Sequence, residues 1–340
     1  MSETYDIAVA GATGVVGEAL LDILVQRKFP VGKVYALASS RSVGKQVDFG
    51  NRSLAVQDIA EFDFSKAQIG LFSAGASVSE VYAPIAAAAG CVVVDNTSRF
   101  RNDDDVPLVV AEVNPQDIAQ YKSTGIIANP NCSTMQMVVA LKPIYDAVGI
   151  ARINVCTYQA VSGAGKSAVE DLARQSARLL NGQPLELEGD ARQIAFNAVP
   201  HIDAFQDNRY TREEMKMVWE TRKIMGDDTI AVNPTAVRIP VFFGHSEAVH
   251  VETDKKITAA EVCDLLRQAD GVELMDGVET GEYPTAVTDA SGNDPVYVGR
   301  VREDISHPTG IDLWIVSDNI RKGAALNSVQ IAEILAKNYL

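Results

Sequence analysis

The stretch DIAVAGATGVVG, residues 6–17, decides the fold of the first part of the chain. Ile7–Ala10 is a short apolar run that ends at Gly11, and a helical pattern follows from Val15 to about Gln26. A strand, a tight turn and a helix in this order are typical of a doubly wound α/β domain. The glycines let backbone N–H groups approach a pyrophosphate at the helix N-terminus. We therefore expect a dinucleotide to bind at Gly11, Thr13, Gly14, Val15, Val16 and Gly17.

Further short apolar runs follow in the first third of the chain. The predicted strands are Val34–Ala38, Ile69–Phe72, Cys91–Val94 and Gly125–Ala128. They are continuous rather than alternating, which is typical of parallel strands buried on both faces. A helix is predicted from Val78 to Ala89, with a kink at Pro84. We expect a Rossmann-like domain over residues 1–130, with the C-terminal helix, 320–340, packing back onto it.

After about Asn131 the pattern changes, and it predicts an α+β domain with a mixed sheet over residues 131–319. A helix is expected from Ser133 to about Ala147, with a kink or break at Pro143. Thr211 and Thr258 each begin a capping box, and Gly226 suits the end of the first of these helices. The predicted strands are Ile153–Ala160, Ala236–Phe243, Ala248–Val251, Val296–Val301 and Ile311–Val316, and the predicted last helix runs from about Gly323 to Asn338.

The composition excludes several classes of function. The 340 residues carry a formal net charge of −15, which disfavours binding to nucleic acid or to an anionic membrane. The four cysteines show no CxxC spacing, so we expect neither a disulfide framework nor a metal site. No leader is apparent, and the longest apolar stretch, Ala83–Val94, is too short for a membrane span. We expect a cytoplasmic protein with a small anionic substrate.

The end of the second strand indicates which dinucleotide binds. A cofactor with a free ribose 2′-hydroxyl usually meets an acidic residue there. Here the strand is followed by Ser39–Ser42, which contains no acid, and Arg41 and Ser42 suit a 2′-phosphate. We therefore expect NADP (NADPH) rather than NAD. The alternatives are a polar loop with a solvated arginine and, for the glycines, an ordinary turn.

The hexapeptide Asn129–Thr134, NPNCST, is the most informative about chemistry. A strand ends before it, Pro130 breaks the chain, and Ser133 opens a helix. Cys132 is thereby predicted at a helix N-terminus, where the dipole and the free N–H groups favour a nucleophilic thiolate. Most cysteines in proteins are instead buried and structural. The other three, Cys91, Cys156 and Cys263, fit that description because they lie within strand or helix patterns.

Other polar residues are ambiguous on the residues alone. Of the four histidines, His245 follows a glycine at a predicted strand end and could project into a cleft, but a lone histidine is more often a surface or core residue. Glu213 and Lys216 lie three apart on one helix face, which most simply indicates a solvated ion pair. Arg99 and Arg101 flank Phe100 in what is most simply a solvated loop.

Taken together, the motifs resemble bacterial aspartate-semialdehyde dehydrogenases over nearly the whole chain. The segments that carry the resemblance are Gly11–Gly17, Asn96–Arg101, Asn129–Thr134, Thr157–Gly165, Glu213–Lys216, Arg238–His245 and Ser317–Gly323. The resemblance implies reduction of L-aspartyl 4-phosphate to L-aspartate 4-semialdehyde by NADPH with release of phosphate. It also implies a place in lysine, methionine, threonine and diaminopimelate biosynthesis, and a homodimer joined through the second domain.

The resemblance also implies roles for individual residues. Cys132 is the thioester nucleophile, His245 the acid/base, and Gln159 orients the substrate. Arg238 pairs with the substrate carboxylate and Glu213 with its amino group. The implied phosphate ligands are Arg101, Asn131 and Lys216, and the implied cofactor contacts in the second domain are Ser162, Gly163 and Asn319. Two other functions stay open: an N-acetylglutamyl phosphate reductase-like enzyme and a non-catalytic paralogue.

Overall fold

The computed structural model describes residues 4–187, 189 and 192–340. The chain forms two compact units: one comprises the chain up to Asn131 together with Gly323–Leu340, and the other is Cys132–Lys322. The boundary that we expected after residue 130 thus falls after residue 131, and the C-terminal return begins at Gly323. In the described part of the chain, no helix is long and apolar enough to cross a membrane.

The first unit is built on a six-stranded parallel sheet with the order β5-β2-β1-β6-β7-β8. Its strands are β1 (Tyr5–Ala10), β2 (Val31–Ala38), β5 (Gln57–Asp58), β6 (Ile69–Phe72), β7 (Val92–Asp95) and β8 (Ile126–Ala128). Every residue of β6, β7 and β8 is buried, as the continuous apolar runs predicted. A small antiparallel hairpin, β3 (Gln46–Phe49) and β4 (Arg52–Ala55), was not predicted.

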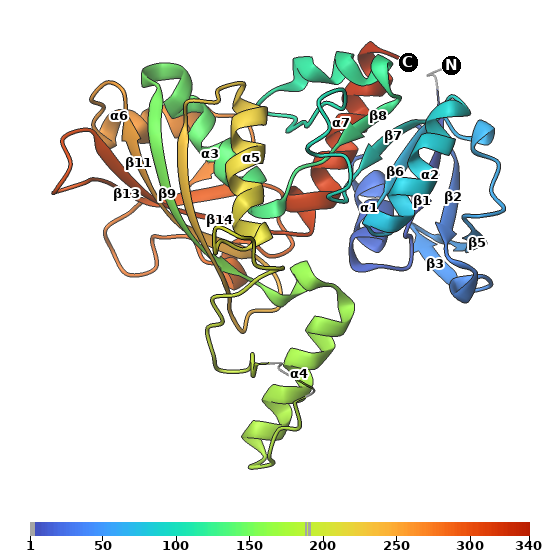
Figure 1. Ribbon diagram of the computed structural model, residues 1–340, viewed down its shortest axis with the longest axis horizontal. Helices are drawn as coiled ribbons and strands as arrows, with labels where there is room; N and C mark the ends of the chain where they lie inside the picture. Colours follow the sequence, from blue (N-terminus) through green and yellow to red (C-terminus); the bar gives the residue numbers. More distant parts are fainter. Residues whose placement is uncertain (1–3, 188, 190–191) are drawn as a thin grey trace. The chain divides into compact units, whose positions relative to one another are not determined.

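Three α-helices belong to this unit: α1 (Val15–Gln26), α2 (Ala76–Ala88) and α7 (Leu326–Asn338). The helix predicted from Val15 to Gln26 is confirmed, and α2 continues through Pro84. The red ribbon of α7 lies among the blue elements of the first unit (Figure 1), and its apolar side chains share a core with those of α1 and β1. A turn of π-helix, Arg321–Ala325, precedes α7, so that this helix begins later than predicted.

The second unit contains a six-stranded mixed sheet with the order β10-β9-β11-β14-β13-β12. Its strands are β9 (Ile150–Gln159), β10 (Ala231–Arg238), β11 (His245–Thr253), β12 (Val272–Leu274), β13 (Val296–Glu303) and β14 (Gly310–Ser317). Along β11 the odd-numbered residues from His245 to Thr253 are all buried, whereas Ala248, His250 and Glu252 on the opposite face are at least partly exposed. This face-to-face alternation gives the sheet an inner and an outer face.

The helices of this unit are α3 (Cys132–Val148), α4 (Lys166–Leu180), α5 (Arg212–Met225) and α6 (Ala259–Gln268). Both predicted capping boxes are present, and Gly226 ends α5 in the left-handed conformation with φ 65°. Helix α3 continues through Pro143 and packs on β9, β11, β13 and β14. Helix α4 extends away from the sheet of its own unit (Figure 1).

One strand prediction was wrong in a way that matters for the site. We expected a strand over Ala236–Phe243, but β10 ends at Arg238 and the residues from Ile239 to Gly244 form a turn. The strand also begins earlier than predicted and includes Pro234, which is tolerated because β10 is an edge strand. His245 consequently begins β11 instead of following a strand end.

Candidate active site

Cys132 and His245 form the centre of the candidate site. Cys132 is the first residue of α3 and is partly exposed, as the hexapeptide predicted. Its Sγ lies 3.2 Å from Nε2 of His245, which is the first residue of β11 and is completely buried. Gly244 makes the entry to β11 possible, because its φ is +88° and an added Cβ would lie 2.7 Å from the carbonyl oxygen of Ala286.

The surroundings of His245 fix its protonation. The backbone N–H of Ala160 donates to Nδ1 at 3.0 Å, so that Nδ1 is an acceptor and the proton of the neutral ring resides on Nε2. Burial, helped by the neighbouring charge of Arg238, lowers the pKa of His245 to about 3, although Glu213 opposes the shift. At neutral pH the imidazole is therefore neutral and presents its Nε2–H to the sulfur.

Arg238 and Gln159 end two neighbouring strands beside this pair and lie opposite each other in the register. Nη1 of Arg238 donates to the carbonyl oxygen of Ala160 at 2.6 Å. Burial lowers the pKa of Arg238 overall, although the negative charges of Cys132 and Glu213 act to raise it. Arg238 also lines a cavity of about 410 Å³.

Glu213 and Lys216 form a largely buried ion pair, so the interpretation as a solvated pair was wrong. Lys216 Nζ lies 2.9 Å from Oε2 of Glu213 and 2.9 Å from Oδ2 of Asp203. Burial acts to lower the pKa of Lys216, but the two carboxylates raise it overall, so the ammonium stays charged. Gln159 joins this group, because its Nε2 donates to Oε1 of Glu213 at 3.2 Å. Thr157 donates in turn to Oε1 of Gln159 at 2.9 Å.

Ser162, Gly163 and Asn319 lie around the same centre. The buried Asn319 amide donates to Oγ of Ser162 at 3.0 Å and accepts from the N–H of Gly244 at 2.9 Å. It thereby ties the loop after β9 to the turn that precedes His245. A Cβ on Gly163 would lie 3.2 Å from Nη1 of Arg238 and 3.5 Å from Nε2 of His245, so a side chain there would crowd both groups.

In the first unit the glycine motif has the close approaches that it predicted. Gly11 has φ +86°, and a Cβ on Gly17 would lie 2.1 Å from the carbonyl oxygen of Gly11. Gly14 is the N-cap of α1 and offers no side-chain cap, so the first N–H groups of the helix, from Val15 to Gly17, remain available to an anion. Thr13 is partly exposed in the same turn.

The other residues assigned to the first unit differ in burial. Arg41 and Ser42 lie in a 3₁₀ turn, Ser40–Ser42, directly after β2. Arg41 is exposed and forms no ion pair within the described residues. Arg101 is buried instead, and its guanidinium donates to the carbonyl oxygens of Thr97 at 3.1 Å and Asn96 at 2.8 Å, so the solvated-loop interpretation fails for it. Asn131 is also buried.

Comparisons with known proteins show the family of the chain. Residues 6–121 match the family model of the semialdehyde dehydrogenase NAD binding domain, and residues 141–322 match that of the semialdehyde dehydrogenase dimerisation domain. An aspartate-semialdehyde dehydrogenase of Legionella pneumophila is 62% identical over 340 residues, which cover 100% of this chain and 98% of the relative. The chain belongs to the aspartate-semialdehyde dehydrogenase family. It is therefore an oxidoreductase with a nicotinamide-binding unit.

Solved structures of the family have the same fold. Aspartate semialdehyde dehydrogenase II of Vibrio cholerae, solved in complex with ASA, superposes with a TM-score of 0.97 at 59% identity and full coverage of both chains. The enzyme of Candida albicans, solved with NADP, gives a TM-score of 0.76 at 27% identity and covers 99% of this chain and 100% of its own. The predicted fold class, a Rossmann-like unit and a mixed-sheet unit, is confirmed.

The sequence did not reveal every polar group at the candidate site. Asp203, which holds Lys216, lies in an irregular segment before α5 and carries no recognisable pattern. Ala160 contributes only its backbone, through the N–H to His245 and the carbonyl oxygen to Arg238. No side-chain pattern could have indicated either contact, because both depend on how three strands meet.

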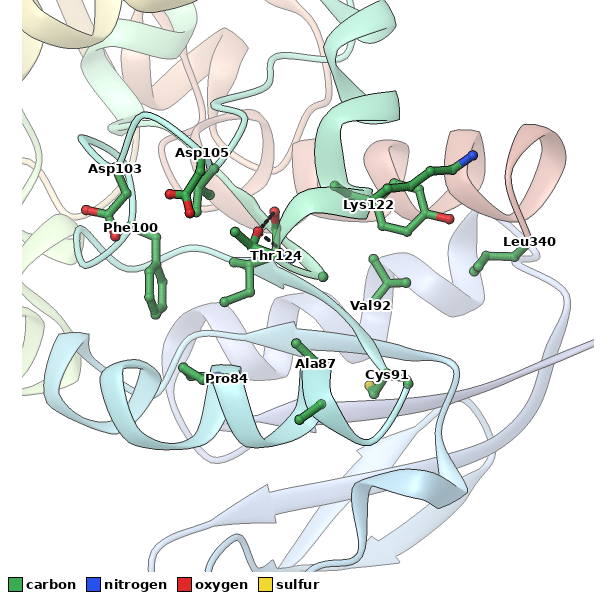
Figure 2. Close-up of a pocket in the computed structure, with 16 residues that line it drawn as sticks. Pro84, Ala87, Cys91, Val92, Phe100, Asp103, Asp105, Lys122, Thr124 and Leu340 are labelled. Atoms are coloured by element: carbon green, nitrogen blue, oxygen red, sulfur yellow. Dashed lines mark hydrogen bonds between the residues drawn. The ribbon is translucent and has the colours of Figure 1, made fainter.

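A second cavity, in the first unit, lies apart from the predicted site residues. A groove of about 760 Å³ lies in the first unit between α2 and the strand starts of β7 and β8, near the C-terminus (Figure 2). Small apolar side chains such as Ala87 and Val92 line it. Asp103, one of its acidic residues, is paired with Arg99 at 3.2 Å. None of the predicted catalytic or cofactor residues lines this groove.

Proposed function

We propose that the chain reduces L-aspartyl 4-phosphate to L-aspartate 4-semialdehyde with NADPH, releasing phosphate, through a thioester on Cys132. The observation that carries the proposal is the 3.2 Å approach of Cys132 Sγ to an imidazole whose Nδ1 is occupied by a backbone N–H. A neutral imidazole in this state cannot accept a proton from the thiol at Nε2. It instead donates a hydrogen bond to the sulfur and favours the thiolate, the form that acts as a nucleophile.

In the reducing direction, Sγ of Cys132 attacks the acyl carbon, the C–O bond to phosphate breaks, and a thioester remains. A reduced nicotinamide, when bound, would supply the hydride that the thioester carbon accepts. When the C–S bond breaks, its electron pair returns to Sγ and the semialdehyde leaves without a net proton. The predicted acid/base role of His245 takes the form of an Nε2–H that stabilises negative charge on sulfur and on the reacting oxygen.

The charges around the thiol complement the proposed substrate. Arg238 suits the α-carboxylate, because a guanidinium can hold a carboxylate through two parallel hydrogen bonds. Glu213 suits the ammonium group, and Gln159, which donates to Glu213, suits the role of orienting the substrate. Lys216 suits the phosphate. Arg101 and Asn131 of the first unit are proposed as further ligands of the same phosphate.

The cofactor is proposed to be NADP. The N-terminus of α1 suits the pyrophosphate, and Arg41 with Ser42 suits the 2′-phosphate, since Arg41 is exposed and its guanidinium has no carboxylate partner in the described part of the chain. Ser162, Gly163 and Asn319 are proposed contacts of the second unit to the cofactor. The Candida albicans relative was solved with NADP, which supports the choice.

We also propose a homodimer joined through the outer face of the mixed sheet. At its centre a hollow of about 310 Å³ is lined by residues of β9, β10, β11 and β14, including Cys156, Ala248 and His250. Ala248 is exposed although it lies on a central strand. The match to a dimerisation domain over residues 141–322 supports this assignment. A cytoplasmic enzyme of lysine, methionine, threonine and diaminopimelate biosynthesis follows from the same proposal.

The two alternatives are disfavoured by specific residues. The substrate of an N-acetylglutamyl phosphate reductase carries a neutral acetamide in place of an ammonium group. The buried carboxylate of Glu213 favours an ammonium group. A non-catalytic paralogue would not need Cys132 beside a donor imidazole at 3.2 Å.

One coupled assay tests the proposal. With aspartate semialdehyde, phosphate and NADP, we expect formation of NADPH, and none when phosphate is omitted or when the acetylated glutamyl analogue replaces the substrate. NADPH formation that does not depend on phosphate would contradict the acyl-phosphate chemistry. Slow stoichiometric alkylation of Cys132 at neutral pH would favour the inert paralogue.

A further inference from the structure

A second polar pair lies directly behind Cys132 and His245. Gln136 follows Cys132 by four residues in α3, and Glu247 follows His245 by two residues in β11. Four helical residues advance about 6 Å and two strand residues about 6.7 Å, and each spacing returns to the same face of its element. Because α3 packs on β11, Gln136 and Glu247 are neighbours in the same way as Cys132 and His245, one helical turn further along α3. We call Gln136 and Glu247 the inner pair.

The inner pair is enclosed in apolar and neutral surroundings. Glu247 is 0% exposed and Gln136 is 1% exposed. The elements packed against β11 are β9, β14 and α3, and the residues directly opposite Glu247 in the register are Thr157 and Ile315. Along its own strand the inner-face neighbours are His245, which is neutral, and Val249. None of these groups carries a positive charge that could compensate a carboxylate.

Glu247 is therefore held as a neutral acid. Burial raises the pKa of its carboxyl well above the ordinary value, and the Gln136 amide opposes this shift only in part. The amide acts on the carboxyl without the geometry of a full hydrogen bond, and no other described group bonds to either carboxyl oxygen. An ionised carboxylate at this place would lie one helical turn from Cys132 and would disfavour the thiolate.

A buried polar pair restricts the register between two elements more strongly than an apolar pair does. Two apolar side chains tolerate sliding with a modest change in packing energy. A buried carboxylic acid and a buried amide lose their only polar neighbour if the helix shifts along the strand, which leaves polar groups unmatched in the core. The inner pair thus favours one register of α3 against β11, and that register also sets the distance from Cys132 to His245.

We propose that Glu247 is a positioning residue: as a neutral acid opposite Gln136, it fixes the first turn of α3 against β11 and so holds Cys132 Sγ near Nε2 of His245. The inference rests on the proposed thioester chemistry. It makes no use of a charge on Glu247, so an uncharged amide of the same shape must serve equally well. A leucine of similar size must not.

The experiment measures the pH dependence of Cys132 alkylation by iodoacetamide in the enzyme without substrate, together with Tm, kcat and KM. Glu247→Leu is expected to move the alkylation midpoint to higher pH and to lower kcat about tenfold, with KM changed less than about twofold. Glu247→Gln is expected to restore both the alkylation profile and kcat to within about twofold of wild type. Cys132→Ala identifies the labelled thiol.

Val249→Ala is the matched control, because Val249 is the next inner-face residue of β11 and is 2% exposed. It should lower Tm and leave the alkylation midpoint unchanged. If Glu247→Leu does not fold, Gln136→Met removes the amide from the other side and should give the same shift. A wild-type alkylation profile in a folded Glu247→Leu or Gln136→Met variant would overturn the proposal. So would a Glu247→Gln variant that behaves like Glu247→Leu, or an equal shift in Val249→Ala.

The alkylation profile separates this proposal from the proposed function. If wild type fails to turn over aspartate semialdehyde, the proposed function is wrong, but the thiol profile of the variants still tests the role of Glu247. If turnover is normal and the profiles do not differ, only the positioning role fails.

Discussion

The two sheets of this protein use their strands in different ways. In the parallel sheet of the first unit, strands such as β6 and β7 are buried on both faces and consist mostly of packing residues. The predicted cofactor contacts of this unit lie beyond the strand ends, in the turns after β1 and β2 and in the first turn of α1. In the mixed sheet of the second unit one face is enclosed, and polar side chains on the strands themselves face inward, among them Gln159, His245 and Glu247. The first sheet is thus a scaffold for loops, whereas the inner face of the second is itself part of the site.

The largest expected effect is a loss of activity that leaves cofactor binding by the first unit near normal. Cys132→Ala should abolish phosphate-dependent oxidation of the semialdehyde, lowering kcat by a factor on the order of 10⁴ or more, because no other group can form the thioester. Binding of NADP should stay near normal, since the glycine motif belongs to the first unit. Cofactor fluorescence titration and turnover measure the two halves. Retained turnover would rule out the thioester mechanism.

Arg238→Ala should mainly weaken substrate capture. Loss of a charge-assisted contact of this kind costs about 1.5–3 kcal/mol, which corresponds to roughly a 10- to 150-fold fall in kcat/KM. Arg238→Lys should recover only part of it, because an ammonium cannot replace the planar fork. Steady-state kinetics with varied semialdehyde measure the effect. An unchanged kcat/KM in the alanine variant would mean that Arg238 does not hold the carboxylate.

The mixed sheet also differs from the parallel sheet because positions on its outer face, such as Ala248, are exposed in the described part of the chain. Ala248→Arg should place a charge at the centre of the proposed contact between copies and convert the dimer to monomers at micromolar concentration. Light scattering after size exclusion gives the mass. Val81→Arg, at a half-exposed position of α2 in the first unit, is the control and should leave the mass unchanged. A dimeric Ala248→Arg variant would place the interface elsewhere.

Arg41→Ala should have a smaller effect, confined to the first unit. We expect it to weaken NADP several-fold while NAD changes little, because NAD has no 2′-phosphate for a guanidinium to hold. Comparing kcat/KM for both cofactors in wild type and variant measures the change. A wild-type preference for NAD, or an equal loss for both cofactors, would show that Arg41 is an ordinary solvated residue.

The last prediction is that the ionisation of His245 has no effect on kcat/KM near neutral pH. Because the folded-state pKa of His245 is about 3, the imidazole takes up a proton only near that pH, and kcat/KM should show no limb from its ionisation between pH 5 and pH 8. The unfolded chain binds this proton near the ordinary pKa, about 6.5, so His245 contributes stability that is present above pH 6.5 and is lost as the pH falls toward 3. A pH–rate profile that loses an acid limb in His245→Gln would contradict this.

Local signals in the sequence were sufficient for much of the structure. The run from Ile7 to Gly17 predicted β1, the turn and α1, because strand, glycine turn and helix are specified by neighbouring residues. Thr211 and Thr258 predicted helix starts for the same reason, since a capping box closes within four residues. Pro130 and Ser133 predicted that Cys132 begins a helix. By itself the sequence therefore determined the Rossmann-like unit, the two capped helix starts and the place of the thiol.

Only the tertiary structure decided which polar residues meet that thiol. His245 resembled three other histidines until β11 was paired with β9, where the Ala160 N–H fixes its tautomer. Glu213 and Lys216 looked solvated because their burial depends on how other segments pack around them, among them the irregular segment before α5 that carries Asp203. Glu247 gave no signal at all, since its neighbour Gln136 lies more than a hundred residues earlier. Contacts of this kind depend on how distant elements pack, and no local pattern of residues encodes that packing.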